Sequence, residues 1–129
     1  MDAVDTSVLV RLLVADVPPQ TRRARTALSS PAVFISKTVL LECEWVLRYS
    51  YALKAPAITS ALRAVLGLPN VAAEDEDQIG RALTWHEQGM DFADALHLAA
   101  SGRARRLVTF DKALARQAKA LKAGDVTAL

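Results

Sequence analysis

The sequence is poor in the residues that stabilise small exported domains or build all-β folds. Its single cysteine, Cys43, excludes an internal disulfide and a cysteine-rich zinc site. Only 5 glycines and 5 prolines occur in 129 residues, too few for a sandwich with many turns. No apolar run approaches the roughly 20 residues of a membrane span, and acids stand where a signal peptide needs basic residues. We therefore expect a soluble, cytoplasmic protein.

Aromatic residues and an excess of one charge are also scarce. Phe, Trp and Tyr make up 5% of the chain, too few to predict a platform on which single-stranded bases stack. The 16 Lys and Arg residues against 14 Asp and Glu residues give a net charge of +2, which does not identify a nucleic-acid-binding protein. Any RNA would be recognised by shape and phosphate contacts.

Hydrophobic residues make up 52% of the chain, enough for the core of one domain over residues 1–129. Short β-branched or aromatic runs alternate with segments in which apolar residues recur at helical spacing. The predicted strands are 3–4, 32–35, 70–72, 107–110 and 125–127. The predicted helices are 8–16, 19–28, 38–49, 54–68, 74–86, 91–100 and 111–122. This alternation predicts a three-layer α/β/α fold with a mostly parallel central sheet flanked by helices.

Acidic residues occupy conspicuous positions in this pattern. Asp5 and Asp111 each follow a predicted strand. Because parallel strands end at the same edge of a sheet, we expect both carboxylates at one edge, where α/β proteins place functional groups. Glu42 and Asp94 lie inside apolar helical segments, where a carboxylate without a partner is costly. Each of these two residues therefore requires an explanation.

Four carboxylates without a cysteine among them indicate a site for a hard cation. Carboxylates that gather raise one another's pKa unless a divalent cation neutralises them. Such donors suit Mg²⁺ or Mn²⁺ rather than zinc. These ions activate water and offset charge on a phosphate, so phosphodiester hydrolysis needs no Ser or Cys nucleophile. The alternative interpretation is that each acid is a helix cap or a surface residue. This alternative readily explains any single acid, but it explains the whole set of four less well.

Four short segments occur in an order that extends over nearly the whole chain. They are residues 5–10 (DTSVLV), 38–42 (TVLLE) with 45–48 (WVLR), 91–99 (DFADALHLA) and 109–111 (TFD). Together they resemble the PIN-domain ribonucleases, specifically the VapC-type toxins. The resemblance implies an endoribonuclease that depends on Mg²⁺ or Mn²⁺. It also implies an RNA substrate, a cognate VapB-type antitoxin and a homodimer.

The resemblance assigns the catalytic metal site to Asp5, Glu42, Asp94 and Asp111, of which the fourth is the most variable in the family. Asp91 precedes Asp94 by one helical turn on the same face. It is a candidate accessory residue that holds a metal-bound water, or equally the N-cap of its helix.

Two hydroxyl residues, Thr6 and Thr109, match family positions beside the acids. Each hydroxyl can bind a carboxylate oxygen or a water, and a capping role explains it equally well. Ser7 stands where many relatives carry Asn, a difference that leaves the metal acids unchanged.

Several other residues are interpreted as structural. Glu44 is two residues after the second acid and so faces away from it on a helix. His97 is expected to be packed and hydrogen-bonded, and His86 to be structural near a helix end. Trp45 and Trp85 are expected in the core or at an interface.

Basic residues supply candidate contacts to RNA phosphates. Arg103, Arg105 and Arg106 follow the third motif closely, and a solvated surface is the alternative interpretation. Arg11 and Arg48, on the helices of the first two motifs, are candidates for ion pairs with nearby acids.

We therefore interpret the sequence as a metal-dependent endoribonuclease, the toxin of a VapBC-type toxin–antitoxin pair. One alternative is a phosphotransferase with a nucleophilic Asp, but Asp2 and Asp5 are three residues apart and do not form the Asp-x-Asp pair of that chemistry. The other is a non-catalytic PIN-like module that binds RNA or a protein. Such a module would be free to lose acids, and all four are present.

Overall fold

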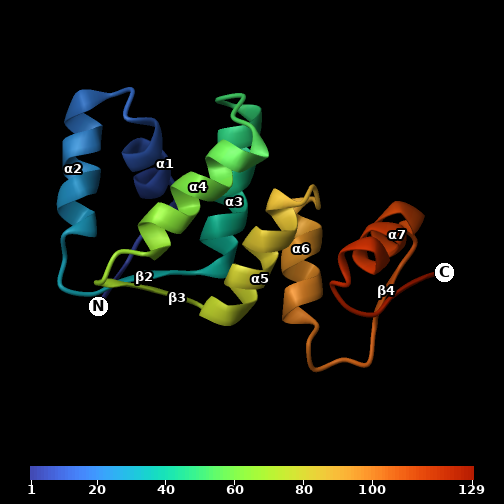
Figure 1. Cartoon of the computed structure of the whole chain (residues 1–129). Coiled ribbons are helices and arrows are strands. Elements are labelled where there is room, and N and C mark those ends of the chain that lie inside the picture. The colour runs from blue at the N-terminus through green and yellow to red at the C-terminus, as the bar shows by residue number, and fades with distance from the viewer. The chain divides into compact units, whose positions relative to one another are not determined.

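The computed structural model describes residues 1–129 and contains two compact units, Met1–Glu76 and Asp77–Leu129 (Figure 1). The first unit contains β1 (Asp2–Ala3), α1 (Thr6–Val14), α2 (Pro18–Leu28), β2 (Val33–Ile35), α3 (Lys37–Tyr49), α4 (Ala55–Leu66) and β3 (Val71–Ala73). The helix α5 (Glu76–Glu87) begins at the last residue of the first unit. The second unit continues with α6 (Phe92–Ala100), β4 (Leu107–Thr109), α7 (Lys112–Leu121) and β5 (Val126–Ala128).

The first unit is built on a parallel sheet in the order β1-β2-β3. Val33 of the central strand pairs with Asp2 on one side and with Val71 on the other. Val33 and Ile35 are fully buried, as expected for a strand covered on both faces. The helix α1 packs against α2 and α3, and α3 packs against α4. The core that these helices close includes Leu9, Leu40, Leu47, Ile58 and Leu62.

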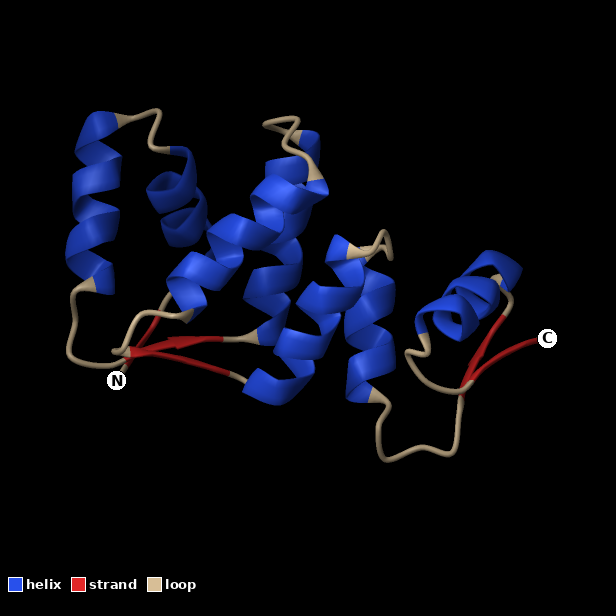
Figure 2. Cartoon of the chain, in the orientation of Figure 1, coloured by secondary structure: helices blue, strands red, loops and turns tan.

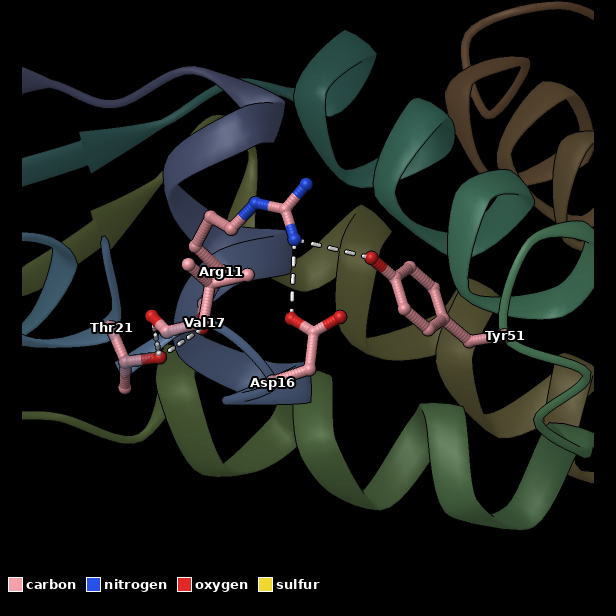
Figure 3. A network of polar contacts seen from close by, with 5 residues as sticks. All are labelled: Arg11, Asp16, Val17, Thr21 and Tyr51. Atoms are coloured by element: carbon pink, nitrogen blue, oxygen red, sulfur yellow. Dashed lines mark hydrogen bonds and ion pairs between the residues drawn. The ribbon is translucent and has the colours of Figure 1, made fainter. Parts of the chain in front are cut away.

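Polar side chains connect the end of α1 to the segments around it (Figure 3). Arg11 donates to Asp16 at 3.1 Å and to the Tyr51 hydroxyl at 3.3 Å. The Thr21 hydroxyl donates to the carbonyls of Arg11 and Val17 at 3.3 and 3.1 Å. The expectation that Arg11 pairs with a nearby acid is therefore confirmed, and the acid is none of the four metal-site candidates. Because both charged side chains are over a third exposed, the ion pair contributes little stability.

The second unit combines helices with a parallel pair of strands, β4 and β5. The helix α7 packs against both strands, as the colouring of Figure 2 makes easy to follow. Phe92 is fully buried, and the His86 ring lies 5.3 Å from it. His86 Nδ1 is hydrogen-bonded to the Met90 carbonyl at 2.9 Å. The structural interpretation of His86 is thus confirmed.

Every predicted helix and strand is present, with ends shifted by a few residues at most, and the α/β class with parallel strands is confirmed. The strands form a parallel sheet of three within the first unit and a parallel pair within the second, in keeping with the predicted mostly parallel α/β/α fold. The edge strand β1 is only two residues long and is hydrogen-bonded to β2 alone. Asp5 follows β1 in the first unit, and Asp111 follows β4 in the second. None of the helices has the length and apolar character that a membrane crossing requires.

Two glycines of the second unit are expected to respond oppositely to alanine. Gly80 lies inside α5 with open space around its Cα, so Gly80→Ala should stabilise the protein by about 0.5–1 kcal/mol. Gly89 has a φ of 104°, which strains any side chain, so Gly89→Ala should destabilise by about 1 kcal/mol or more. Urea unfolding measures both changes. Equal effects of the two substitutions would contradict this account of the backbone.

Candidate active site

The first candidate acid, Asp5, connects β1 to α1. It is exposed, and its carboxylate accepts a hydrogen bond from the Thr6 N–H at 2.7 Å as the N-cap of the helix. The Thr6 hydroxyl is buried and has no hydrogen-bond partner in the protein. The Thr6 hydroxyl therefore does not bind the Asp5 carboxylate. A carboxylate oxygen and a water were the two expected partners of this hydroxyl, and the water remains.

The helix α3 carries Glu42 and Glu44 on different faces. Its buried face contains Leu40, Cys43, Glu44 and Leu47, whose spacing of three and four residues is that of one helical stripe. Glu42 lies outside this stripe and is exposed. The prediction that Glu42 is a buried acid in need of a partner is therefore wrong. The prediction that Glu44 faces away from Glu42 is confirmed.

The buried Glu44 carboxylate forms an ion pair with Arg48, whose side chain is 37% exposed. The Glu44 side chain is 2% exposed, and both of its carboxylate oxygens accept from Arg48 Nε, at 3.0 and 3.1 Å. This hydrogen bond with Glu44 raises the pKa of Arg48. Burial, with the charges of Glu44 and Glu42, raises the pKa of the Cys43 thiol to about 12. Cys43 is thus a protonated core residue, and Glu44 is committed to Arg48 rather than to a metal.

Removing one partner of the ion pair should cost more than removing both. Arg48→Met leaves the Glu44 charge buried and unpaired, and we expect it to lower the free energy of unfolding by roughly 3 kcal/mol. The double variant Glu44→Leu/Arg48→Met leaves no buried charge and should recover most of that loss. Urea unfolding provides the measurement, with the exposed Arg25→Ala as control. Equal losses in the single and double variants would show that the pair is unimportant.

The second unit places three acids at the starts of two helices. Asp91 is the N-cap of α6 and accepts from the Asp94 N–H at 3.1 Å. Asp111 is the N-cap of α7 and accepts from the Leu114 N–H at 3.0 Å. The Thr109 hydroxyl accepts from the Asp111 N–H at 3.0 Å. Both caps therefore hold a carboxylate at the positive end of a helix dipole.

Asp94 is half-buried in the first turn of α6. Burial raises its pKa, and the negative charges of Asp91 and Asp111 raise that pKa further, against a smaller lowering by His97. Asp91 and Asp111 thus each oppose ionisation of Asp94. Because a cation relieves such repulsion, and because carboxylate oxygens are the donors that Mg²⁺ and Mn²⁺ prefer, these residues fit a hard divalent ion. Within either unit, no three His, Cys, Asp or Glu side chains are gathered closely enough to enclose a metal ion.

The raised pKa of Asp94 predicts that Asp94→Asn stabilises the metal-free protein at pH 7. Above the folded-state pKa the ionised carboxylate opposes folding. As the pH falls through this raised pKa towards the pKa of about 3.9 in the unfolded chain, Asp94 of the folded wild type binds a proton. The difference in the free energy of unfolding between wild type and Asp94→Asn then disappears. Urea unfolding in EDTA between pH 4 and 8 checks this. The exposed Asp77→Asn serves as control, and a difference between wild type and Asp94→Asn that does not change with pH would contradict the prediction.

Several other candidates differ from expectation in their exposure. His97 is exposed on the outer face of α6, so the prediction of a packed side chain is wrong. Trp45 is 53% exposed, 5.1 Å from the Tyr49 ring, and does not belong to the core. Phe110, directly before Asp111, is 82% exposed. The sequence predicts Phe110 to be the last residue of a strand, and the strand ends one residue earlier.

The candidate RNA contacts, Arg103, Arg105 and Arg106, are exposed between α6 and β4. Arg106 donates to the Thr127 hydroxyl at 3.5 Å. None of the three pairs with an acid, because the ion pairs within the units are those of Arg11, Lys37 and Arg48. Their charges are therefore available to an anion.

Parallel strands that lead into helices with carboxylates at their N-termini define an α/β protein with a candidate site for a divalent cation. The profile of the PIN domain family matches residues 3–120, so this chain belongs to the PIN domain family. The match includes residues of both units and every candidate acid. The family assignment made from the four motifs is thereby confirmed.

Among solved structures, the chain is similar to VapC20 of Mycobacterium tuberculosis, a toxin that cleaves the sarcin-ricin loop. The two are 22% identical, with 90% of this chain and 94% of that chain covered and a TM-score of 0.46. No curated protein sequence matches this chain.

Proposed function

We propose that this PIN-domain protein is an endoribonuclease that hydrolyses RNA phosphodiester bonds with Mg²⁺ or Mn²⁺, and that it is the toxin of a VapBC-type pair. The proposal is supported by the PIN family match over residues 3–120 and by the places of Asp91, Asp94 and Asp111 at the starts of α6 and α7. A half-buried carboxylate with a raised pKa, next to two capping carboxylates, is typical of functional sites. The toxin assignment rests on the four motifs that resemble VapC-type toxins.

We further propose that the two compact units form one PIN domain over residues 1–129. The family match supports this, because it extends across both units without interruption. The resemblance of the motifs to VapC-type toxins names Asp5, Glu42, Asp94 and Asp111 as the metal ligands, with Asp91 in an accessory role. Asp5 and Glu42 suit this role because both are exposed and neither takes part in an ion pair.

The division of labour in this site follows from the chemistry of its residues. When bound, the divalent ion supplies a water of lowered pKa and offsets the charge that develops on the phosphate. The N-cap hydrogen bonds hold Asp5 and Asp111 in fixed orientations. Asp94 would hold the cation through its carboxylate oxygens, and the cation would offset the unfavourable ionisation that raises the pKa of Asp94.

The partners of this activity are an RNA substrate, a VapB-type antitoxin that inhibits the enzyme, and a second copy of the chain in a homodimer. These proposals rest on the resemblance of the motifs. A non-catalytic PIN-like module is disfavoured because Asp5, Glu42, Asp94 and Asp111 are all retained and the ion pairs within the units leave them out.

Cleavage of total RNA by the purified, antitoxin-free protein tests the proposed function. We expect discrete products with Mg²⁺ or Mn²⁺, none in EDTA, and at least about 100-fold slower cleavage by Asp94→Asn. Asp77→Asn is the matched control, since Asp77 is an exposed acid of the same unit outside the site. Cleavage that persists in EDTA, or that Asp94→Asn leaves unchanged, would falsify the metal-dependent mechanism.

A further inference from the structure

The second unit contains a cavity of about 390 Å³ away from the candidate acids. Its walls come from α5, the end of α6, the segment before β4 and the turn after α7. Four cationic side chains line it together with one tryptophan and one carboxylate; these residues are Arg81, Arg105, Arg106, Lys122, Trp85 and Asp125. The volume lies at the lower end of the range for pockets that hold small molecules.

The charge of this cavity is unbalanced. None of its four cations has an acidic side chain within ion-pair distance, and Asp125 is the only carboxylate in the lining. Arg106 is oriented by its hydrogen bond to Thr127. Gathering like charges without counter-charges costs electrostatic free energy, which an anionic ligand with several charges recovers. The cavity therefore suits a phosphate-bearing ligand.

Trp85 adds an aromatic surface to these cations. It is partly exposed, one residue before the buried His86 of α5. Sites for single-stranded nucleic acid combine cations that contact the backbone with aromatic rings on which bases stack. Inorganic phosphate alone would leave the tryptophan without a role, whereas a nucleotide uses both features.

The backbone after α7 shapes one wall of the cavity. Lys122 ends the helix in the left-handed region, with a φ of 53°, and Gly124 has a φ of 136°. A Cβ on Gly124 would lie 3.5 Å from the Leu98 side chain of α6. The turn therefore brings Lys122 and Asp125 next to the end of α6, and its backbone at residue 124 favours glycine.

The cavity and the acids occupy opposite ends of the same elements. Asp94 and Asp111 lie at the starts of α6 and α7, whereas the cavity adjoins their C-terminal ends and the beginning of β4. Since α7 contains 10 residues, about 15 Å of helix separates these ends. One nucleotide cannot contact both places, so the cavity is a site separate from the acids.

We propose that this cavity binds a nucleotide of the single-stranded RNA substrate, with its phosphates at Arg81, Arg105 and Lys122 and its base against Trp85. The proposal rests on the proposed ribonuclease function and adds a subsite that anchors the substrate at a distance from the bond that is cut. It extends the sequence-based prediction for Arg105 and Arg106, and it adds a stacking contact that the low aromatic content did not predict.

The test follows Trp85 fluorescence in the full-length protein carrying Trp45→Phe, which leaves Trp85 as the single tryptophan. The titrant is a single-stranded RNA of about eight nucleotides, in EDTA so that no cleavage occurs. We expect RNA to quench the fluorescence. The added pair Arg81→Gln/Arg105→Gln should weaken binding at least tenfold. It should also reduce the slope of log K against log salt concentration by about 1.4, since each phosphate contact contributes about 0.7.

The matched control is Arg116→Gln, which removes an exposed arginine of α7 outside the cavity and should leave binding almost unchanged. Circular dichroism confirms that each variant is folded. Unquenched fluorescence, or equal weakening by the control and by the cavity variant, overturns the proposal. Quenching by an oligoglutamate peptide but not by RNA also overturns it, and identifies the cavity as a contact for an acidic protein segment.

The binding assay and the cleavage assay can overturn the subsite and the proposed function separately. Metal-dependent cleavage without quenching would overturn the subsite alone. Quenching without cleavage of any RNA would overturn the proposed function and leave an RNA-binding protein with this cavity as its site.

Discussion

The hydrogen bond that a backbone N–H in the first turn of a helix donates to an N-cap carboxylate is the interaction on which the fold and the candidate site both depend. Asp5, Asp91 and Asp111 make this bond at the starts of α1, α6 and α7. Each bond satisfies an N–H group that the helix itself leaves without a partner. It also places a carboxylate at the positive end of the helix dipole. The residues that begin these helices are thus the ones that offer oxygen ligands to a cation, and capping and metal binding are compatible roles.

Glu44 and Asp94 are both shielded from solvent, but the charges of their carboxylates are compensated differently. Glu44 is almost completely buried and is neutralised by Arg48 of its own helix, so its charge is satisfied within the protein. Asp94 is half-buried beside two further carboxylates, and its raised pKa records the repulsion among them. The ionised Asp94 carboxylate therefore opposes folding at neutral pH, a cost that a cation at this place would offset. This contrast between an internally compensated acid and an uncompensated one separates a structural carboxylate from a candidate ligand.

Sequence reasoning succeeded where the signal is local. Apolar spacing predicted every helix and strand, and the capping role that the sequence left open as an alternative for Asp91 and Asp111 is present in both. It failed at Glu42 because both glutamates of α3 have apolar neighbours in the sequence, and only the packing of the helix shows which of them faces the core. It also failed to associate Arg81 with Lys122, since 41 positions separate two residues that line one cavity.

By itself, the sequence determined the order and type of the secondary-structure elements, the capping acids and the PIN family, because these depend on residues close together in the chain or on motifs in a set order. Only the tertiary structure decided the register in which the strands pair, that Glu44 rather than Glu42 is buried, and which cations line a cavity with Trp85. These features depend on contacts between distant segments, where burial and mutual repulsion set the energy of each charge. No local pattern encodes those contacts.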